Sequence, residues 1–351
     1  MDSTPFSLSA CGVNRHHWYP NGDLIIVNTL PGSTYQLFRI HKSLLMRYSP
    51  VFARNLHAAK EIRNGILVHR VEEQPRSIDA LFRCLYQPSV KPFKDTDIVA
   101  YEELLDLCIK YQILSVVKRI VTHFHAYYPA TLRQWDWNEA KLIYASSQCG
   151  FDLEEYFPEP IAMIQLARKH HIHSLLPIAF YYLSTINPNC EYADRTIRSG
   201  RNSVESQAHL RAGRCSARWR DLQPDDCSRL LHGKNTIACH VLNDFLVVPT
   251  CEDRHCFHER SQLHKSIIEE AIMDRDVLLA LKRGLYNLSP AGTFQGVCVN
   301  CRHTLGVSIE KRREGLWLDL PALFGLLECR SAWSRLVVNT GHGSVSGQAS
   351  N

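Results

Sequence analysis

A chain of 351 residues is too long for a single hydrophobic core, so it predicts at least two folding units. A hydrophobic content of 45% with a charged content of 21% is typical of globular protein and excludes disorder along the whole chain. The formal net charge of +5 is too small at this length to indicate a nucleic-acid-binding protein by itself.

The first residues have neither a basic start nor a following apolar run, and no apolar segment approaches the roughly 18 residues that a bilayer requires. We expect residues 1–19 to be flexible and the protein to be intracellular, in the cytoplasm or nucleus, with no membrane partner. The thirteen scattered cysteines form no framework of a small disulfide scaffold. Most of them should therefore be reduced core thiols.

The first predicted unit spans residues 20–127 and begins with a hairpin. Residues 23–27 and 35–40 are rich in β-branched and aromatic side chains, and a Pro-Gly-Ser turn separates them. Helical spacing follows, and Ser49 before Pro50 marks the start of a second short helix, because serine is a favoured N-cap and proline a favoured first residue.

Residues 66–71 predict a further strand, and Pro75 opens a helix whose apolar residues share one face. Two more helical patterns follow, around residues 101–108 and 115–124. The order of strands and helices predicts an α+β fold, with a small sheet and flanking helices.

The rest of the chain predicts four further segments. Residues 128–187 contain three helical patterns and predict a mainly helical extension. Residues 188–221 predict a loop or a disordered insertion, because positions 191–220 hold seven arginines, three acidic residues and few apolar side chains. Residues 222–338 predict a mixed, largely helical region that contains cysteines, and residues 339–351 a disordered tail.

One motif in the first unit resembles a known family. The pattern His-Lys-x-x-Leu-x-x-x-Ser-x-x-Phe starts at residue 41, directly after the hairpin, and is similar to the pattern of the BTB/POZ family. The segment ALFRCLYQPS resembles that family's Phe-x-x-Leu-x-Tyr helix, shifted in detail. The residues that carry the resemblance are Asp23, His41, Lys42, Leu45, Ser49, Phe52, Leu85 and Tyr86.

The resemblance, which is greatest to fungal BTB-domain proteins, implies a protein–protein interaction module without enzymatic activity. Its partners would be proteins: a second copy of itself, a cullin or a transcriptional co-regulator. A small-molecule substrate is not expected. The spacing of Leu45, Phe52 and Leu85 agrees, because it places them in a core. We therefore expect an adaptor or regulator that acts through its binding surfaces.

Asp23, His41 and Ser49 are also the residue types of a hydrolytic triad. However, no nucleophile-elbow glycines flank Ser49, and its place before Pro50 is explained by an N-cap role. We expect a structural His41 near a strand end, where it is a candidate partner for a buried Asp23. An enzyme with an unrecognised site remains an alternative.

The residues before Asp23 contain two prolines and two glycines, which disfavour a long helix there. Many BTB dimers exchange an N-terminal helix and strand between subunits. The prolines and glycines before Asp23 depart from that pattern and argue against a strand-exchanged homodimer. One face of the domain is then left for another partner or another dimer geometry.

Two close cysteine pairs near the C-terminal end can close a tetrahedral zinc site, because each short turn can direct two sulfurs to one point. The zinc would be structural, since protein ligands fill all four positions. The alternative is that these are ordinary reduced cysteines. The candidate ligands are Cys251, Cys256, Cys298 and Cys301, with His255, His258 and His303 as substitutes.

The segment after the second pair contains Trp-x-x-Leu-Pro-x-x-Phe at residues 317–324, which is similar to a step in the C-terminal part of the same fungal proteins. A second functional hypothesis is a DNA-associated transcriptional regulator that uses the arginine-rich segment and the zinc site. No DNA-reading motif flanks that segment, so nucleic acid is not the expected partner.

Overall fold

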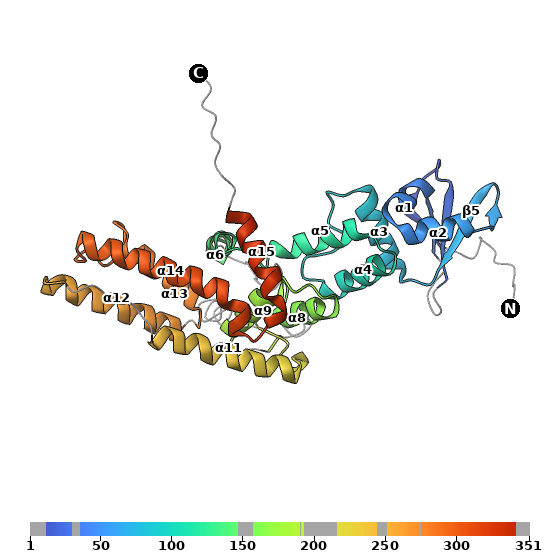
Figure 1. Ribbon diagram of the computed structural model, residues 1–351. Helices are drawn as coiled ribbons and strands as arrows, with labels where there is room; N and C mark the ends of the chain where they lie inside the picture. Colours follow the sequence, from blue (N-terminus) through green and yellow to red (C-terminus); the bar gives the residue numbers. More distant parts are fainter. Residues whose placement is uncertain are drawn as a thin grey trace, which may run out of the picture. The chain divides into compact units, whose positions relative to one another are not determined.

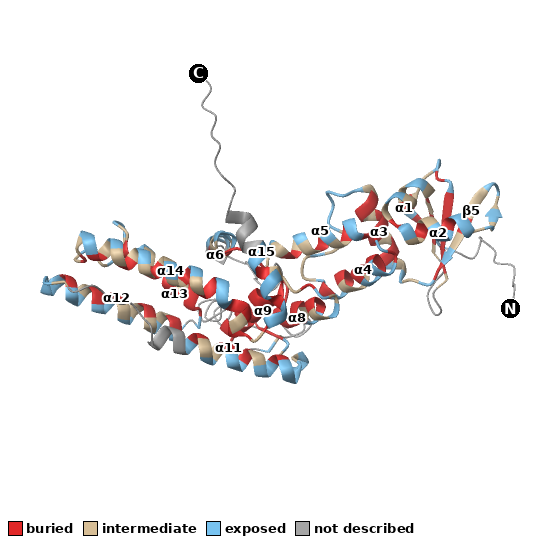
Figure 2. Cartoon of the chain, in the orientation of Figure 1, coloured by how far each residue is buried: buried red, intermediate tan, exposed pale blue. Residues whose placement is uncertain are grey.

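The computed structural model describes residues 12–29, 36–146, 157–189, 191–192, 216–243, 251–273 and 275–341. The chain divides into two compact units, Met1–His123 and Phe124–Asn351. Figure 1 shows their elements along the chain and Figure 2 shows which residues are buried. No described helix combines the length and the apolar character needed to cross a membrane.

The first unit is built on a five-stranded mixed sheet with the order β1-β3-β2-β5-β4. Strand β2 is buried along its whole length, since it pairs antiparallel with β3 on one side and parallel with β5 on the other. The strands are β1 (Gly12–Trp18), β2 (Leu24–Asn28), β3 (Gln36–Ile40), β4 (Ile62–Arg63) and β5 (Ile66–Val71).

Five helices accompany this sheet, and the division between the two units falls within the last of them. Helix α3 packs an apolar face on the sheet, where the ring of Phe82 meets that of Phe38 edge to face at a centroid distance of 5.3 Å. The helices are α1 (Lys42–Tyr48), α2 (Pro50–Ala58), α3 (Pro75–Tyr86), α4 (Ile98–Lys110) and α5 (Leu114–His125).

Strand β1 corrects the sequence analysis, which predicted a flexible segment through residue 19. It pairs parallel with β3 and docks on α3, where the Asn14 side chain donates a hydrogen bond of 2.8 Å to Asp79. His17 is buried beside the same carboxylate, and the ring of Tyr19 stacks on that of Tyr86 at 4.4 Å. These partners are distant in sequence, so local composition gave no sign of the strand.

The second unit is helical in its described residues, apart from an isolated bridge between Glu191 and Ala217. The region predicted as mixed therefore shows no strand where the structure describes it. The arginine-rich stretch 193–215 and the tail 342–351 lie outside the described residues. The α-helices are α6 (Leu132–Ser146), α8 (Pro160–Lys169), α9 (Leu176–Thr185), α11 (Pro224–Asn243), α12 (Arg254–Met273), α13 (Val277–Leu288), α14 (Val299–Leu323) and α15 (Arg330–Gly341), and two short 3₁₀ helices cover Trp219–Asp221 and Leu327–Cys329.

Helix α9 is the centre of the second unit, because all ten of its residues are buried (Figure 2). Its Tyr181 hydroxyl donates to the Asp276 carboxylate at 2.6 Å and accepts from the Leu278 backbone N–H at 2.9 Å. Asp276 in turn caps α13 by accepting from the N–H of Leu279. One buried tyrosine thus fixes where α13 begins.

Helices α12, α13 and α14 pack side by side through a close approach at Gly284. A Cβ atom at this position would lie 2.5 Å from Cδ1 of Ile267 in α12 and 3.8 Å from Cδ1 of Ile309 in α14. At its C-terminal end, α14 is held by aromatic packing: Trp317 and Phe324 are almost fully buried, and the indole N–H of Trp333 donates to the Trp317 carbonyl. The Trp-x-x-Leu-Pro-x-x-Phe step is therefore core structure.

We expect acid to destabilise the first unit through His17. Burial lowers the pKa of this side chain below its ordinary 6.5, so the unfolded state binds the proton more readily. The contribution of neutral His17 to the stability of the first unit is fully present above pH 6.5, and it is lost as the pH falls below that value. The same burial lowers the pKa values of His69 and His123.

The measurement is hydrogen exchange of β1 and β3 at about pH 7.5 and about pH 5.5, corrected for intrinsic rates. His17→Gln should make the opening free energy less dependent on pH. The reduction should be smaller than ~1.4 kcal/mol per pH unit, which is the slope for the uptake of one full proton. The exposed His57 of α2 provides the control His57→Gln, which should leave the pH dependence of β1 and β3 unchanged. Equal pH dependence in the wild type and His17→Gln would contradict the assignment.

Candidate functional site

The motif serine joins three segments of the first unit. Ser49 is fully buried, and its hydroxyl donates to the Tyr111 carbonyl at 2.5 Å while accepting from the Phe52 backbone N–H at 2.9 Å. The rings of Phe52 and Tyr111 stack beside it with centroids 4.1 Å apart. Ser49 therefore caps α2 and ties it to the turn between α4 and α5.

His41 is held by the tyrosine at the end of α3. Its backbone N–H donates to the Tyr86 hydroxyl at 2.9 Å, and its Nδ1 shares a second hydrogen bond of 2.9 Å with the same hydroxyl. The pair fixes the end of β3 against the end of α3. The sequence interpretation of a structural His41 near a strand end agrees with this position.

Asp23 differs from the prediction, because it is exposed and its partner is not His41. Its carboxylate accepts from the backbone N–H of Lys42 at 2.6 Å, at the start of α1. The three residue types of a hydrolytic triad thus have three separate sets of partners, and no nucleophile–base pair forms between them. Of the other motif positions, Leu45, Phe52 and Leu85 are buried core side chains.

Comparison with protein families agrees with this geometry. The family model of the BTB/POZ domain matches residues 27–127. These residues form a BTB/POZ domain. A search of curated proteins gives no match to the chain. BTB domains generally mediate protein–protein interaction, so the predicted resemblance and the α+β core are confirmed, and the chain carries an interaction module.

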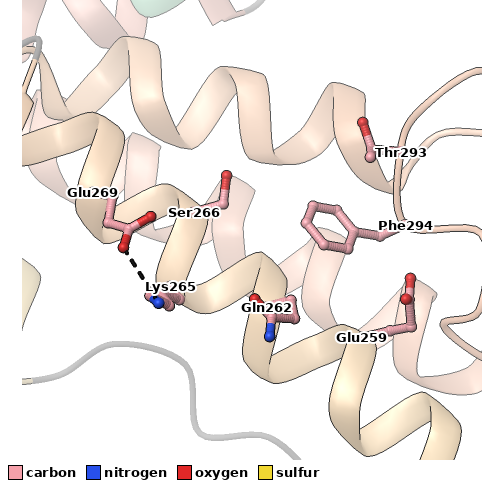
Figure 3. Close-up of a pocket in the computed structure, with 7 residues that line it drawn as sticks. All are labelled: Glu259, Gln262, Lys265, Ser266, Glu269, Thr293 and Phe294. Atoms are coloured by element: carbon pink, nitrogen blue, oxygen red, sulfur yellow. Dashed lines mark ion pairs between the residues drawn. The ribbon is translucent and has the colours of Figure 1, made fainter.

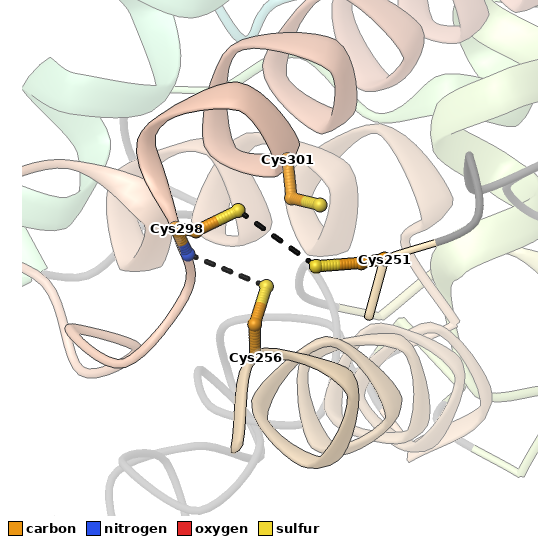
Figure 4. Close-up of side chains that lie close together, drawn as sticks. All are labelled: Cys251, Cys256, Cys298 and Cys301. Carbon is orange, nitrogen blue, oxygen red and sulfur yellow. Dashed lines mark hydrogen bonds between the residues drawn. The ribbon is translucent and has the colours of Figure 1, made fainter. Parts of the chain in front are cut away.

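Beyond the BTB domain, the second unit brings together the two predicted cysteine pairs, here called the four-cysteine cluster. All four Sγ atoms lie within 4.8 Å of one another. The first pair precedes and begins α12, and the second pair caps and begins α14 (Figure 4). The cluster consists of Cys251, Cys256, Cys298 and Cys301.

The sulfurs of the four-cysteine cluster interact directly with each other and with the backbone. Sγ of Cys251 lies 4.0 Å from Sγ of Cys298, and the Cys298 backbone N–H donates to Sγ of Cys256 at 3.3 Å (Figure 4). Hydrogen bonding to Cys301 lowers the pKa of the Cys298 thiol to about 7. Burial raises the pKa of Cys256 to about 12 and also raises that of Cys301.

The three predicted substitute ligands lie apart from this arrangement. His255, His258 and His303 are all exposed, and the group of close ligand atoms contains cysteines alone. A buried side chain that the sequence analysis missed adjoins the sulfurs instead: Nη1 of Arg260 donates to Sγ of Cys301 at 3.5 Å. Arg260 lies four residues after Cys256, one helical turn further along α12, and that spacing is the signal that could have found it.

A shallow groove of about 330 Å³ lies on α12 near the cluster. Figure 3 shows the Phe294 ring pointing toward the α12 side chains, and an ion pair of 3.7 Å joins Lys265 to Glu269. Its lining is polar apart from Phe294. The lining residues are Glu259, Gln262, Lys265, Ser266, Glu269, Thr293 and Phe294.

Ser49→Ala should destabilise the BTB domain by about 2 kcal/mol, because it removes the cap of α2 and the donor to the Tyr111 carbonyl. The amides of α2 should then exchange faster in hydrogen-exchange mass spectrometry. Ser43→Ala, at an exposed position of α1, is the matched control. Unchanged protection of α2 in Ser49→Ala would show that the hydroxyl is dispensable.

Proposed function

We propose that this protein is a non-enzymatic adaptor or regulator, whose BTB domain recruits another protein. The observation that carries the proposal is the internal use of the motif: His41 and Ser49 bond to the domain's own groups. Because these polar residues bond within the domain, we place the binding function on its outer surface. The match to a domain family that generally binds proteins supports the same conclusion.

The arrangement of β1 favours a partner other than a strand-exchanged copy. This strand pairs with β3 of its own chain and is anchored to α3 through Asn14 and Asp79. An exchanged dimer would first have to break these contacts. At the opposite edge of the sheet, β4 is only two residues long, which limits strand addition there.

The turn between α4 and α5 offers a candidate contact surface. Ile109, near the end of α4, exposes 45% of its surface, and Leu114, at the start of α5, exposes 71%. Exposed aliphatic side chains flanked by charge are suited to the centre of a protein interface, and Lys110 and Lys118 supply that charge. We propose that the partner covers Ile109 and Leu114.

The partners that fit the proposal are a cullin or a transcriptional co-regulator, in the cytoplasm or nucleus. The eight cysteines that the structure describes are all free, which suits a reducing compartment. A cullin partner would make the protein a ubiquitin-ligase adaptor. A co-repressor or co-activator would make it a regulator of transcription.

The test is affinity purification of the tagged full-length chain at mild salt, with mass spectrometry of the captured proteins. Changing both Ile109 and Leu114 to glutamate should reduce capture of the specific partner at least about tenfold, because it places charge in an apolar contact. Val90→Glu, at another exposed apolar position of the same unit, is the control.

A chain lacking residues 20–127 separates the possible results of this experiment. Loss of the partner with the deletion but not with the double substitution would move the contact elsewhere on the BTB domain. Retention of every partner after the deletion would contradict the proposed function. Light scattering of the purified chain measures self-association in the same preparation.

A further inference from the structure

The four-cysteine cluster has the dimensions of a site for one tetrahedral metal ion. Sulfurs bound to zinc at about 2.3 Å lie about 3.8 Å apart. The sulfurs here are 4.0 Å apart for Cys251 and Cys298, and no pair exceeds 4.8 Å. The separations therefore exceed the tetrahedral value by at most about 1 Å.

The donor set selects the kind of metal. Four thiolates and no carboxylate favour zinc over magnesium or calcium, which prefer oxygen ligands. A multinuclear iron–sulfur cluster binds its cysteines through different irons, and sulfurs that all lie within 4.8 Å of one another suit a single ion better. With protein ligands at all four positions, the ion would be structural.

The surroundings suit the negative charge of such a centre. Zinc with four thiolates carries a formal charge of about −2. The N-terminal ends of α12 and α14 both meet at the sulfurs, so their helix dipoles favour thiolate there. The buried Arg260 guanidinium and the Cys298 backbone N–H donate to sulfurs, as groups around metal-bound thiolates do.

The loop between α13 and α14 is held in a position that brings Cys298 to the other cysteines. Arg302, in the first turn of α14, donates to the carbonyls of Leu288, Phe294, Gln295 and Val297. A Cβ atom on Gly296 would lie 2.4 Å from Nε2 of His255, so the loop approaches the α12 side chains closely at this position. The loop is thereby held where it delivers Cys298.

We propose that the four-cysteine cluster binds one structural zinc ion, which ties the start of α12 to the start of α14 and fixes the loop that carries Phe294. Two of the sulfurs, those of Cys251 and Cys298, belong to half-buried residues, which gives the ion a path from solvent. The site is independent of the BTB domain and of its partner.

The test begins with metal analysis of the full-length chain, purified under reducing conditions without chelator. About one zinc ion per chain is expected. Cys298→Ser and Cys301→Ser should each lower zinc content or affinity at least about tenfold. Cys227→Ser, at an exposed free cysteine of α11, should keep the full zinc content.

Hydrogen exchange provides a structural readout of the same site. Removing zinc with a chelator should speed exchange in residues 251–258 and 293–301, while the BTB domain remains protected. If the serine variants do not fold, the wild-type chain still decides, because cobalt(II) in a tetrahedral thiolate site gives intense visible absorption.

The proposal is overturned by any of four results. These are zinc below the background of a protein without the cluster, full zinc retention in both serine variants, iron in place of zinc, or a disulfide within the cluster in the chain purified under reducing conditions. A chelator that leaves exchange in both segments unchanged would also remove the structural role, even if zinc were present.

Discussion

The buried hydroxyl of Ser49 is the interaction on which the BTB domain depends most directly. It bonds both to the start of α2 and to the turn that ends α4, and the rings of Phe52 and Tyr111 stack on each other with centroids 4.1 Å apart. In that buried setting the hydrogen bonds are strong, and the hydroxyl proton is committed to the Tyr111 carbonyl. The motif serine that looks reactive in sequence thus holds the start of α2 to the end of α4.

Buried polar groups have the same organising role in the helical unit. Tyr181 and Asp276 set where α13 begins, and Arg313 of α14 reaches Asp136 of α6 at 2.5 Å while almost fully buried. Toward its C-terminal end α14 buries residues 316, 317, 320, 321 and 323, but before residue 316 it buries one side chain in four, at residues 301, 305, 309 and 313. This narrow stripe gives α14 limited apolar area, so its position depends on specific contacts at both ends.

The sequence was sufficient where the signal is local. The strand at residues 66–71 and the helix that starts at Pro75 have the predicted bounds, because turn residues and apolar period mark them. The sequence predicted a flexible segment where residues 12–18 form β1, and a buried Asp23 where the side chain is exposed. Both predictions were wrong, since each arrangement depends on a partner distant in sequence. Cysteine spacing predicted two pairs, but only the packing of α12, α13 and α14 brings the pairs together. That packing also brings Arg260 of α12 to Cys301 of α14.

The four-cysteine cluster lies where α12 and α14 begin, and these first turns bury few side chains. In the first two turns of α12, only Cys256 and Arg260 are buried, and in the first turn of α14 only Cys301. These side chains bury little aliphatic area, so hydrophobic packing cannot supply the stability that Gly284 and its neighbours provide further along. The proposed metal–thiolate cross-link would provide it without a larger core. It would also fix the wall of the groove that contains Phe294, because the loop leading to Cys298 carries that residue.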